Sequence, residues 1–246
     1  MALKNHSLKL LSIQSKTKSP PPSIVYDHRM DKIANVTVLG SGTMGHGIAQ
    51  IAAMSGFKVL LRDVEQRFLD NAMDKIKWSL NKLVEKNKMT KESFDQTLSR
   101  LVPVIDLKEG LKDADLVIEA VPEDLSLKRI VYKEVSSYAD PKTLFASNTS
   151  TLPIGEMAEL TDRPGSFIGL HFFNPPQLMK LVEVIRGHQT EEGTVERLMT
   201  FVEDLGKTPV LVQKDVAGFI VNRIFIPLVH EAVFCKERDG ITYEEI

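Results

Sequence analysis

Two ionisable residues stand out because their neighbours along the chain are apolar. His171 follows the apolar run 167–170, and Glu183 lies in a second apolar run at 181–185. A carboxylate among such neighbours needs a partner, and His171 is the obvious one. A histidine whose tautomer is fixed by a carboxylate can take the proton from an alcohol while hydride leaves the carbon. The pair alone, however, serves structure as often as catalysis.

A glycine-rich turn supplies a second candidate site. Residues 40–45 read Gly40-Ser41-Gly42-Thr43-Met44-Gly45, and they lie between an apolar run at 36–39 and a helix-like segment at 43–55. In this context the glycines permit a tight turn, close approach of a pyrophosphate and close helix–strand packing. The helix N-terminus offers free N–H groups to phosphates. The segment therefore predicts a dinucleotide site.

Asp63 is expected to complete that site. It follows the apolar run 59–62, after which a carboxylate accepts hydrogen bonds from the adenosine ribose. A carboxylate there repels a 2′-phosphate, so the sequence predicts NAD rather than NADP. Arg62 is adjacent, but strand alternation is expected to point it away from Asp63.

Alternating strands and helices must position these residues. Apolar runs predict strands at 36–39, 59–62, 116–118, 144–146, 167–170, 181–184 and 209–212. Helical spacing predicts helices at 43–55, 65–88, 90–101, 124–138 and 191–205, and another from 216. This order predicts an α/β, Rossmann-type doubly wound and mostly parallel sheet with a helical-hairpin insertion, followed by the first helix of an incomplete all-α domain. We expect a disordered tail at 1–29, an NAD-binding domain at 30–214 and the start of a helical domain at 215–246.

Composition narrows the partners. The net charge of −2 provides no broad cationic field for nucleic acid, and polar residues interrupt the most apolar stretch, 216–235, so no membrane span is expected. The single cysteine, Cys235, excludes an intramolecular disulfide and is expected in the core. Lysines, serines and prolines dominate residues 1–29, which predicts a dispensable tail on a cytoplasmic protein. The alternatives are a mitochondrial transit peptide or translation that starts at Met30.

Five motifs, in order along the chain from about residue 33, resemble the 3-hydroxyacyl-CoA dehydrogenase family. They are the glycine-rich turn, Glu119-Ala120-Val121-Pro122-Glu123, Ser147-Asn148-Thr149-Ser150-Thr151, His171-Phe172-Phe173-Asn174-Pro175 and Gly218-Phe219-Ile220-Val221-Asn222-Arg223. The resemblance implies reversible, NAD-dependent oxidation of a (3S)-3-hydroxyacyl-CoA to a 3-oxoacyl-CoA, as in fatty-acid β-oxidation or 3-hydroxybutyryl-CoA metabolism.

The resemblance also implies a role for each matching residue. His171 is the general acid/base and Glu183 its partner, while Ser150 and Asn222 bind near the substrate's 3-oxygen. The cofactor side comprises Gly40, Gly42, Thr43, Met44, Gly45, Asp63, Glu123, Lys128 and Asn148. Ser79 and Lys86 match positions that touch coenzyme A, although both also fit an ordinary helix surface. The family implies a homodimer formed through the C-terminal helical domain.

One departure from the family leaves alternatives open. The chain ends at Ile246, where the family continues into a helical domain, so we expect a fragment or a truncated protein. A non-catalytic NAD-binding relative is one alternative function. A β-hydroxyacid dehydrogenase that acts on a free acid is another, although that family uses a lysine base.

Overall fold

The computed structural model describes residues 32–242 and 244–245, so the tail expected at 1–29 lies outside the described residues. Eight strands form one sheet: β1 (Asn35–Leu39), β2 (Lys58–Arg62), β3 (Leu101–Val104), β4 (Leu116–Glu119), β5 (Leu144–Ser147), β6 (Phe167–Phe172), β7 (Leu181–Ile185) and β8 (Thr208–Val212). The helices are α1 (Thr43–Met54), α2 (Gln66–Glu85), α3 (Lys91–Ser99), α4 (Leu107–Leu111), α5 (Leu125–Tyr138), α6 (Ile154–Ala158), α7 (Glu192–Asp204) and α8 (Val221–Asp239), with a 3₁₀ turn at Pro164–Ser166.

The strand order confirms the predicted doubly wound sheet. The order is β3-β2-β1-β4-β5-β6-β7-β8, and every neighbouring pair is parallel except β6 and β7. The chain therefore leaves β1 toward one edge of the sheet and returns at β4 to build toward the other. In open α/β sheets this reversal opens a crevice at the carboxyl ends of the two central strands.

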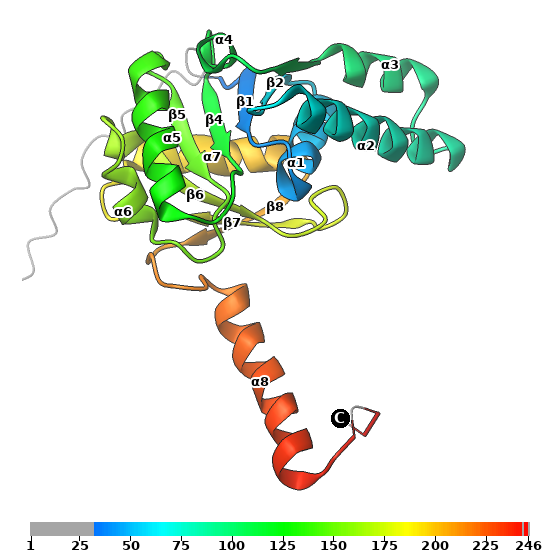
Figure 1. The fold of residues 1–246 in the computed structure, drawn as a ribbon, viewed down its shortest axis with the longest axis vertical. Coiled ribbons are helices and arrows are strands. Elements are labelled where there is room, and N and C mark those ends of the chain that lie inside the picture. The colour runs from blue at the N-terminus through cyan, green and yellow to red at the C-terminus, as the bar shows by residue number, and fades with distance from the viewer. Residues whose placement is uncertain (1–31, 243, 246) are drawn as a thin grey trace, which may run out of the picture. The chain divides into compact units, whose positions relative to one another are not determined.

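Both faces of the sheet are covered, which explains why its central strands are almost wholly apolar. One core cluster joins the sheet to α1, α2, α3 and α7, and a second joins it to α4, α5 and α6. Figure 1 shows α5 in front of the strands and α7 behind them. The hairpin of α2 and α3 lies between β2 and β3 in the chain, as the predicted insertion requires.

Several boundaries differ from the sequence-based expectation. β3 was missed because Leu101 continued the helical pattern and Pro103 argued against a strand, yet β3 is the edge of the sheet, where proline is tolerated. The helix predicted at 65–88 ends at Glu85, since the chain turns through Asn87 at φ 55°. β6 continues through Phe172 because β7 pairs with it beyond Leu170.

The last helix also corrects two expectations. It begins at Val221 rather than near 216, after a turn in which Gly218 and Phe219 both have positive φ. Cys235 lies on α8, none of whose residues is buried, so its expected place in a core was wrong for the described part of the chain. Large apolar side chains of α8 are exposed: Ile224, Phe225, Ile226, Leu228, Val229, Val233 and Phe234. Among the described residues, no helix has the length and hydropathy needed to cross a bilayer.

Candidate active site

A cavity of about 800 Å³ opens at the carboxyl ends of the central strands. Its lining includes the glycine-rich turn after β1, Asp63 after β2, Glu123 after β4, Asn148 after β5 and His171 on β6. Five strand ends thus contribute to one cavity, because parallel strands present their carboxyl ends at the same edge of a sheet. The residues that the sequence singled out separately are therefore brought together.

The glycine-rich turn is shaped so that two of its glycines cannot be replaced. A Cβ on Gly45 would lie 1.8 Å from the Gly40 carbonyl oxygen, where no atom fits. Gly40 has a φ of 92°, and a Cβ there would lie 2.6 Å from the Ala120 carbonyl oxygen. A Cβ on Gly42 would meet nothing within 4 Å, so this glycine faces open space at the cavity. The turn is therefore tightly packed at Gly40 and Gly45 and open to the cavity at Gly42.

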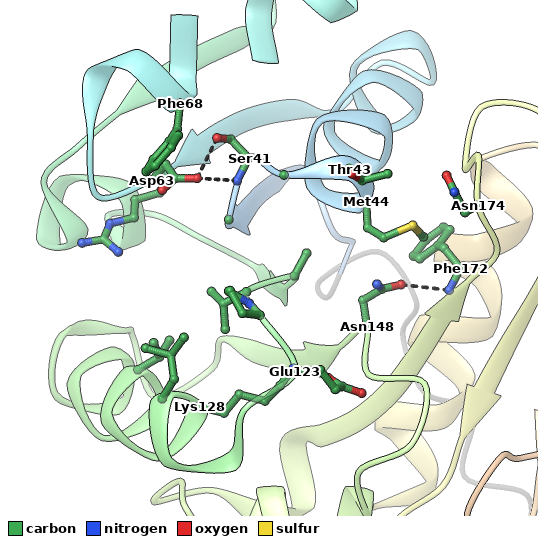
Figure 2. Close-up of a pocket in the computed structure, with 18 of the residues that line it drawn as sticks. Ser41, Thr43, Met44, Asp63, Phe68, Glu123, Lys128, Asn148, Phe172 and Asn174 are labelled. Atoms are coloured by element: carbon green, nitrogen blue, oxygen red, sulfur yellow. Dashed lines mark hydrogen bonds and ion pairs between the residues drawn. The ribbon is translucent and has the colours of Figure 1, made fainter. Parts of the chain in front are cut away.

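Asp63 holds the glycine-rich turn through Ser41 (Figure 2). Its Oδ2 accepts hydrogen bonds from the Ser41 backbone N at 2.7 Å and the Ser41 hydroxyl at 2.6 Å, and its Oδ1 accepts from Val64 N at 2.7 Å. A carboxylate has about four acceptor positions, so one remains for a ligand hydroxyl. Arg62, which was expected to point away, also lines the cavity, and its Nε donates to the Ile105 carbonyl at 3.1 Å.

These features fit a bound dinucleotide. Within the described residues no side chain caps the N-terminus of α1, which leaves its first N–H groups available at the cavity wall beside Gly42. Unpaired N–H groups and the helix dipole suit a pyrophosphate. Asp63 follows β2, the strand next to β1, and a carboxylate at this position would accept a hydrogen bond from a ribose hydroxyl. The residues present therefore fit NAD, and Asp63 opposes the extra phosphate of NADP.

Asn148 and Ser150 line the cavity after β5. Asn148 Oδ1 accepts a hydrogen bond from Phe172 N at 3.0 Å, which ties the end of β5 to the end of β6 and leaves the amide N–H groups to donate (Figure 2). Ser150 N donates to Glu123 Oε1 at 3.0 Å, whereas the Ser150 hydroxyl has no partner among the described residues. Glu123 also accepts from the hydroxyls of Thr149 and Thr151, so one carboxylate shapes the whole turn.

Behind this turn lies a buried network that the sequence reasoning missed. Glu119 is fully buried at the end of β4, and both of its oxygens lie 2.8 Å from the Lys128 Nζ. Glu119 also accepts from Tyr132 Oη at 3.0 Å and Ser147 Oγ at 2.7 Å. Lys128 continues to Glu123 Oε2 at 3.0 Å. The sequence did contain a signal for this network: Glu119 directly follows the apolar run 116–118, and a carboxylate beside an apolar run needs a buried partner, as Glu183 does.

Ionisation in this network follows from burial and pairing. Burial alone would raise the pKa of Glu123, but the hydrogen bond from Thr149 and the charge of Lys128 outweigh it and lower the pKa below its usual value. Burial, followed by the charge of Glu119, raises the pKa of Tyr132 well above its usual value. Tyr132 therefore stays protonated and donates to a carboxylate.

His171 and Glu183 form the predicted pair. They face each other in the antiparallel register of β6 and β7, and His171 Nδ1 lies 2.7 Å from Glu183 Oε2. Both side chains are buried, with exposed fractions of 6% and 0%. Glu183 accepts from Ile220 N and Val221 N through its other oxygen, each at 2.9 Å. This contact with the N-terminus of α8 was not predicted.

These contacts set the tautomer of His171. Burial favours the neutral form of Glu183, but the hydrogen bonds from His171, Val221 and Ile220 outweigh it and lower the pKa of the carboxyl. An ionised carboxylate is an acceptor only, so Nδ1 of a neutral His171 carries the proton. Nε2 then holds the free lone pair. His171 can therefore accept a proton from a ligand in the cavity.

Five predicted residues lie outside the cavity lining: Glu183 and Gly45, which adjoin the lining residues His171 and Gly40, and Asn222, Ser79 and Lys86. Asn222 is half-buried on the first turn of α8. Ser79 lies on α2 and accepts a hydrogen bond from Gln50 Nε2 at 3.0 Å, and Lys86 is exposed at the end of that helix. The cavity lining thus joins His171 to most of the predicted cofactor residues, whereas Asn222, Ser79 and Lys86 lie elsewhere.

A dinucleotide turn and a buried His–Glu pair on one cavity define a Rossmann-type nicotinamide-dependent dehydrogenase. The family model described as 3-hydroxyacyl-CoA dehydrogenase, NAD binding domain, matches residues 35–216. The chain therefore belongs to the 3-hydroxyacyl-CoA dehydrogenase family, which confirms the resemblance seen in its motifs. NAD is the cofactor that this domain binds, as Asp63 predicted.

Individual relatives agree with this assignment. The chain is 45% identical over 198 residues to a probable 3-hydroxybutyryl-CoA dehydrogenase of Deinococcus radiodurans, covering 80% of this chain and 70% of that protein. It is 42% identical over 219 residues to the human mitochondrial hydroxyacyl-coenzyme A dehydrogenase, covering 87% and 69%. The crystal structure of (S)-3-hydroxybutyryl-CoA dehydrogenase from Ralstonia eutropha superposes with a TM-score of 0.84 at 38% identity, covering 87% of this chain and 75% of that one.

Proposed function

We propose that the protein oxidises the 3-hydroxyl of a (3S)-3-hydroxyacyl-CoA to a 3-oxoacyl-CoA in a reversible reaction, with His171 as the general base. NAD, when bound, accepts the hydride from C3. The observation that carries the proposal is that His171, paired with the buried Glu183 at 2.7 Å, lines the same cavity as the glycine-rich turn and Asp63. The names of the relatives support the acyl-CoA substrate class.

The chain's own residues account for the proton and for substrate orientation. His171 Nε2 takes the proton of the 3-hydroxyl, and the ionised Glu183 stabilises the imidazolium that forms. The unpartnered Ser150 hydroxyl binds the 3-oxygen, held in place by the bond from Ser150 N to Glu123. Asn222, on the first turn of α8, adds a polarising donor in the same region. In the reverse reaction the imidazolium returns the proton.

The coenzyme A portion is proposed to contact α2 at Ser79 and Lys86. Lys86 is exposed, and an ammonium suits a phosphorylated ligand. Because Gln50 Nε2 donates to the Ser79 hydroxyl oxygen, the Ser79 proton is left to donate outward. Exposed apolar residues of α8 support the proposal that the full-length protein forms a homodimer through its C-terminal helical domain. We further propose a cytoplasmic location, with mitochondria as the alternative.

A substrate panel tests this function. Reduction of NAD would be followed by the absorbance of NADH, with (3S)-3-hydroxybutyryl-CoA, with free 3-hydroxybutyrate, and with NADP in place of NAD. We expect turnover with the thioester and NAD only. Preference for the free acid would instead indicate a β-hydroxyacid dehydrogenase. Tight NAD binding with no turnover of any 3-hydroxyacyl-CoA would indicate a non-catalytic relative.

A further inference from the structure

The turn that precedes α8 is unusual in both its backbone and its contacts. Phe219 has a φ of 48°, a conformation that L-residues with a large side chain rarely adopt, and it directly follows Gly218 at φ 78°. A bulky residue in the left-handed region is strained and persists only where its surroundings require it. Phe219 is also 2% exposed, although none of the residues of α8 that follow it is buried. The Phe219 side chain is therefore packed into the protein where the side chains of α8 are not.

Several contacts of this turn reach the acid/base pair. The Phe219 ring lies 5.6 Å from the His171 ring, which has Phe173 at 4.5 Å as another ring neighbour. The next two backbone N–H groups, of Ile220 and Val221, both donate to Glu183 Oε1 at 2.9 Å. Successive N–H groups presented by a left-handed turn form a concave site for an anion. Here the anion is the carboxylate that holds His171.

We propose that Phe219 is a positioning residue: its turn holds two N–H groups against Glu183 and its ring against His171, and so fixes the acid/base pair. The catalytic role of this turn rests on the proposed function, whereas its contacts with His171 and Glu183 are independent of that function. Glu183 divides its two oxygens between His171 and α8, so a shift of the turn changes how much negative charge faces the imidazole. The position of α8 is thereby coupled to the proton affinity of the base.

Loss of the Phe219 ring lets water reach the imidazole, which favours its charged form. Loosening the two amides removes hydrogen bonds that stabilise the Glu183 charge, so more of that charge acts on the imidazolium. Both changes raise the pKa of His171. Other charged groups on the cavity wall or beside the turn are Arg62, Asp63, Lys75, Glu123, Lys128, Asp215 and Arg223, and within the described residues none of them bonds to either member of the pair.

The test is an NMR titration of the His171 imidazole in Phe219→Ala, assigned by comparison with His171→Asn. Phe201→Ala is the matched control, because Phe201, on α7, is equally buried but packs elsewhere. Its ring centroid lies 5.0 Å from that of Phe57. We expect the His171 ring signals to titrate at a higher pH in Phe219→Ala than in the wild type, and the control to match the wild type. The kcat for oxidation should fall about tenfold or more, and Phe219→Leu should restore most of it.

A second variant covers the case in which Phe219→Ala does not fold. Gly218→Ala strains the same turn while it keeps the ring, since a Cβ at φ 78° would lie 3.3 Å from Arg223 N. It should raise the same pKa. An unchanged pKa in a folded Phe219→Ala, or in Gly218→Ala, overturns the proposal. The titration needs no substrate, so a shifted pKa in a protein without turnover would sink the proposed function and leave this inference standing.

Discussion

Removal of the Lys128 ammonium should destabilise the protein strongly. Lys128 is 1% exposed and lies 2.8 Å from both oxygens of the fully buried Glu119. Lys128→Met keeps the volume but leaves the carboxylate without its counter-charge. Breaking a buried pair in this way costs about 3–5 kcal/mol. The hydrogen bonds from Tyr132 and Ser147 remain, so we expect the lower end, about 3 kcal/mol.

Urea denaturation followed by circular dichroism would measure this loss in the absence of NAD. For a domain of this size, about 3 kcal/mol corresponds to a fall in Tm of about 6–12 °C. Lys75→Met is the matched control, because Lys75 lines the same cavity but is exposed, and its loss should change stability by less than about 0.5 kcal/mol. Adding Glu119→Gln to Lys128→Met should recover much of the stability, since the unpaired charge is then gone. A loss below about 1 kcal/mol in Lys128→Met would refute the reasoning.

Three further predictions concern the cofactor turn and the acid/base pair. Asp63→Asn should weaken NAD binding about tenfold or more, because a charged acceptor is lost, and should narrow the preference over NADP, as titration calorimetry would show; equal NAD affinity in the variant would speak against the ribose contact. Gly45→Ala should lose about 1–3 kcal/mol of stability together with NAD binding, since its Cβ would overlap the Gly40 carbonyl; retained binding would show that the turn can relax. Because the pKa of Glu183 is lowered in the folded state, its contribution to stability is present above about pH 4.3 and is lost as pH falls through its folded value. The gap in unfolding free energy between wild type and Glu183→Gln should therefore close as pH falls below about 4.3, and a gap that widens there would contradict that sign.

Much of the site could be predicted because local patterns carried it. The glycine-rich turn and Asp63 depend on a strand, a turn and a helix that are adjacent in the sequence. His171 and Glu183 could be paired because each is an ionisable residue in an apolar run, and burial without a partner is costly. The register of β6 and β7 then placed them directly opposite each other.

The features that the sequence did not predict depend on contacts between residues that are far apart in the sequence. Glu119 finds its partners on α5 and β5, and nothing within its own strand indicates that Lys128 would turn inward. The turn at Phe219 takes its shape from Glu183, which lies 36 positions earlier. Cys235 was placed in a core because its helix is apolar, but that surface is exposed in the described chain. Apolar composition shows that a helix seeks a partner and does not show that the partner is present.

The central claim is that His171 is the base in an NAD-dependent oxidation of a 3-hydroxyacyl-CoA. The most direct test measures NADH oxidation with acetoacetyl-CoA in the wild type, in His171→Asn and in His188→Asn, a surface histidine whose side chain is 60% exposed. We expect turnover in the wild type and in His188→Asn, and a loss of about 10²-fold or more in His171→Asn with unchanged NAD affinity. Wild-type turnover in His171→Asn would contradict the account.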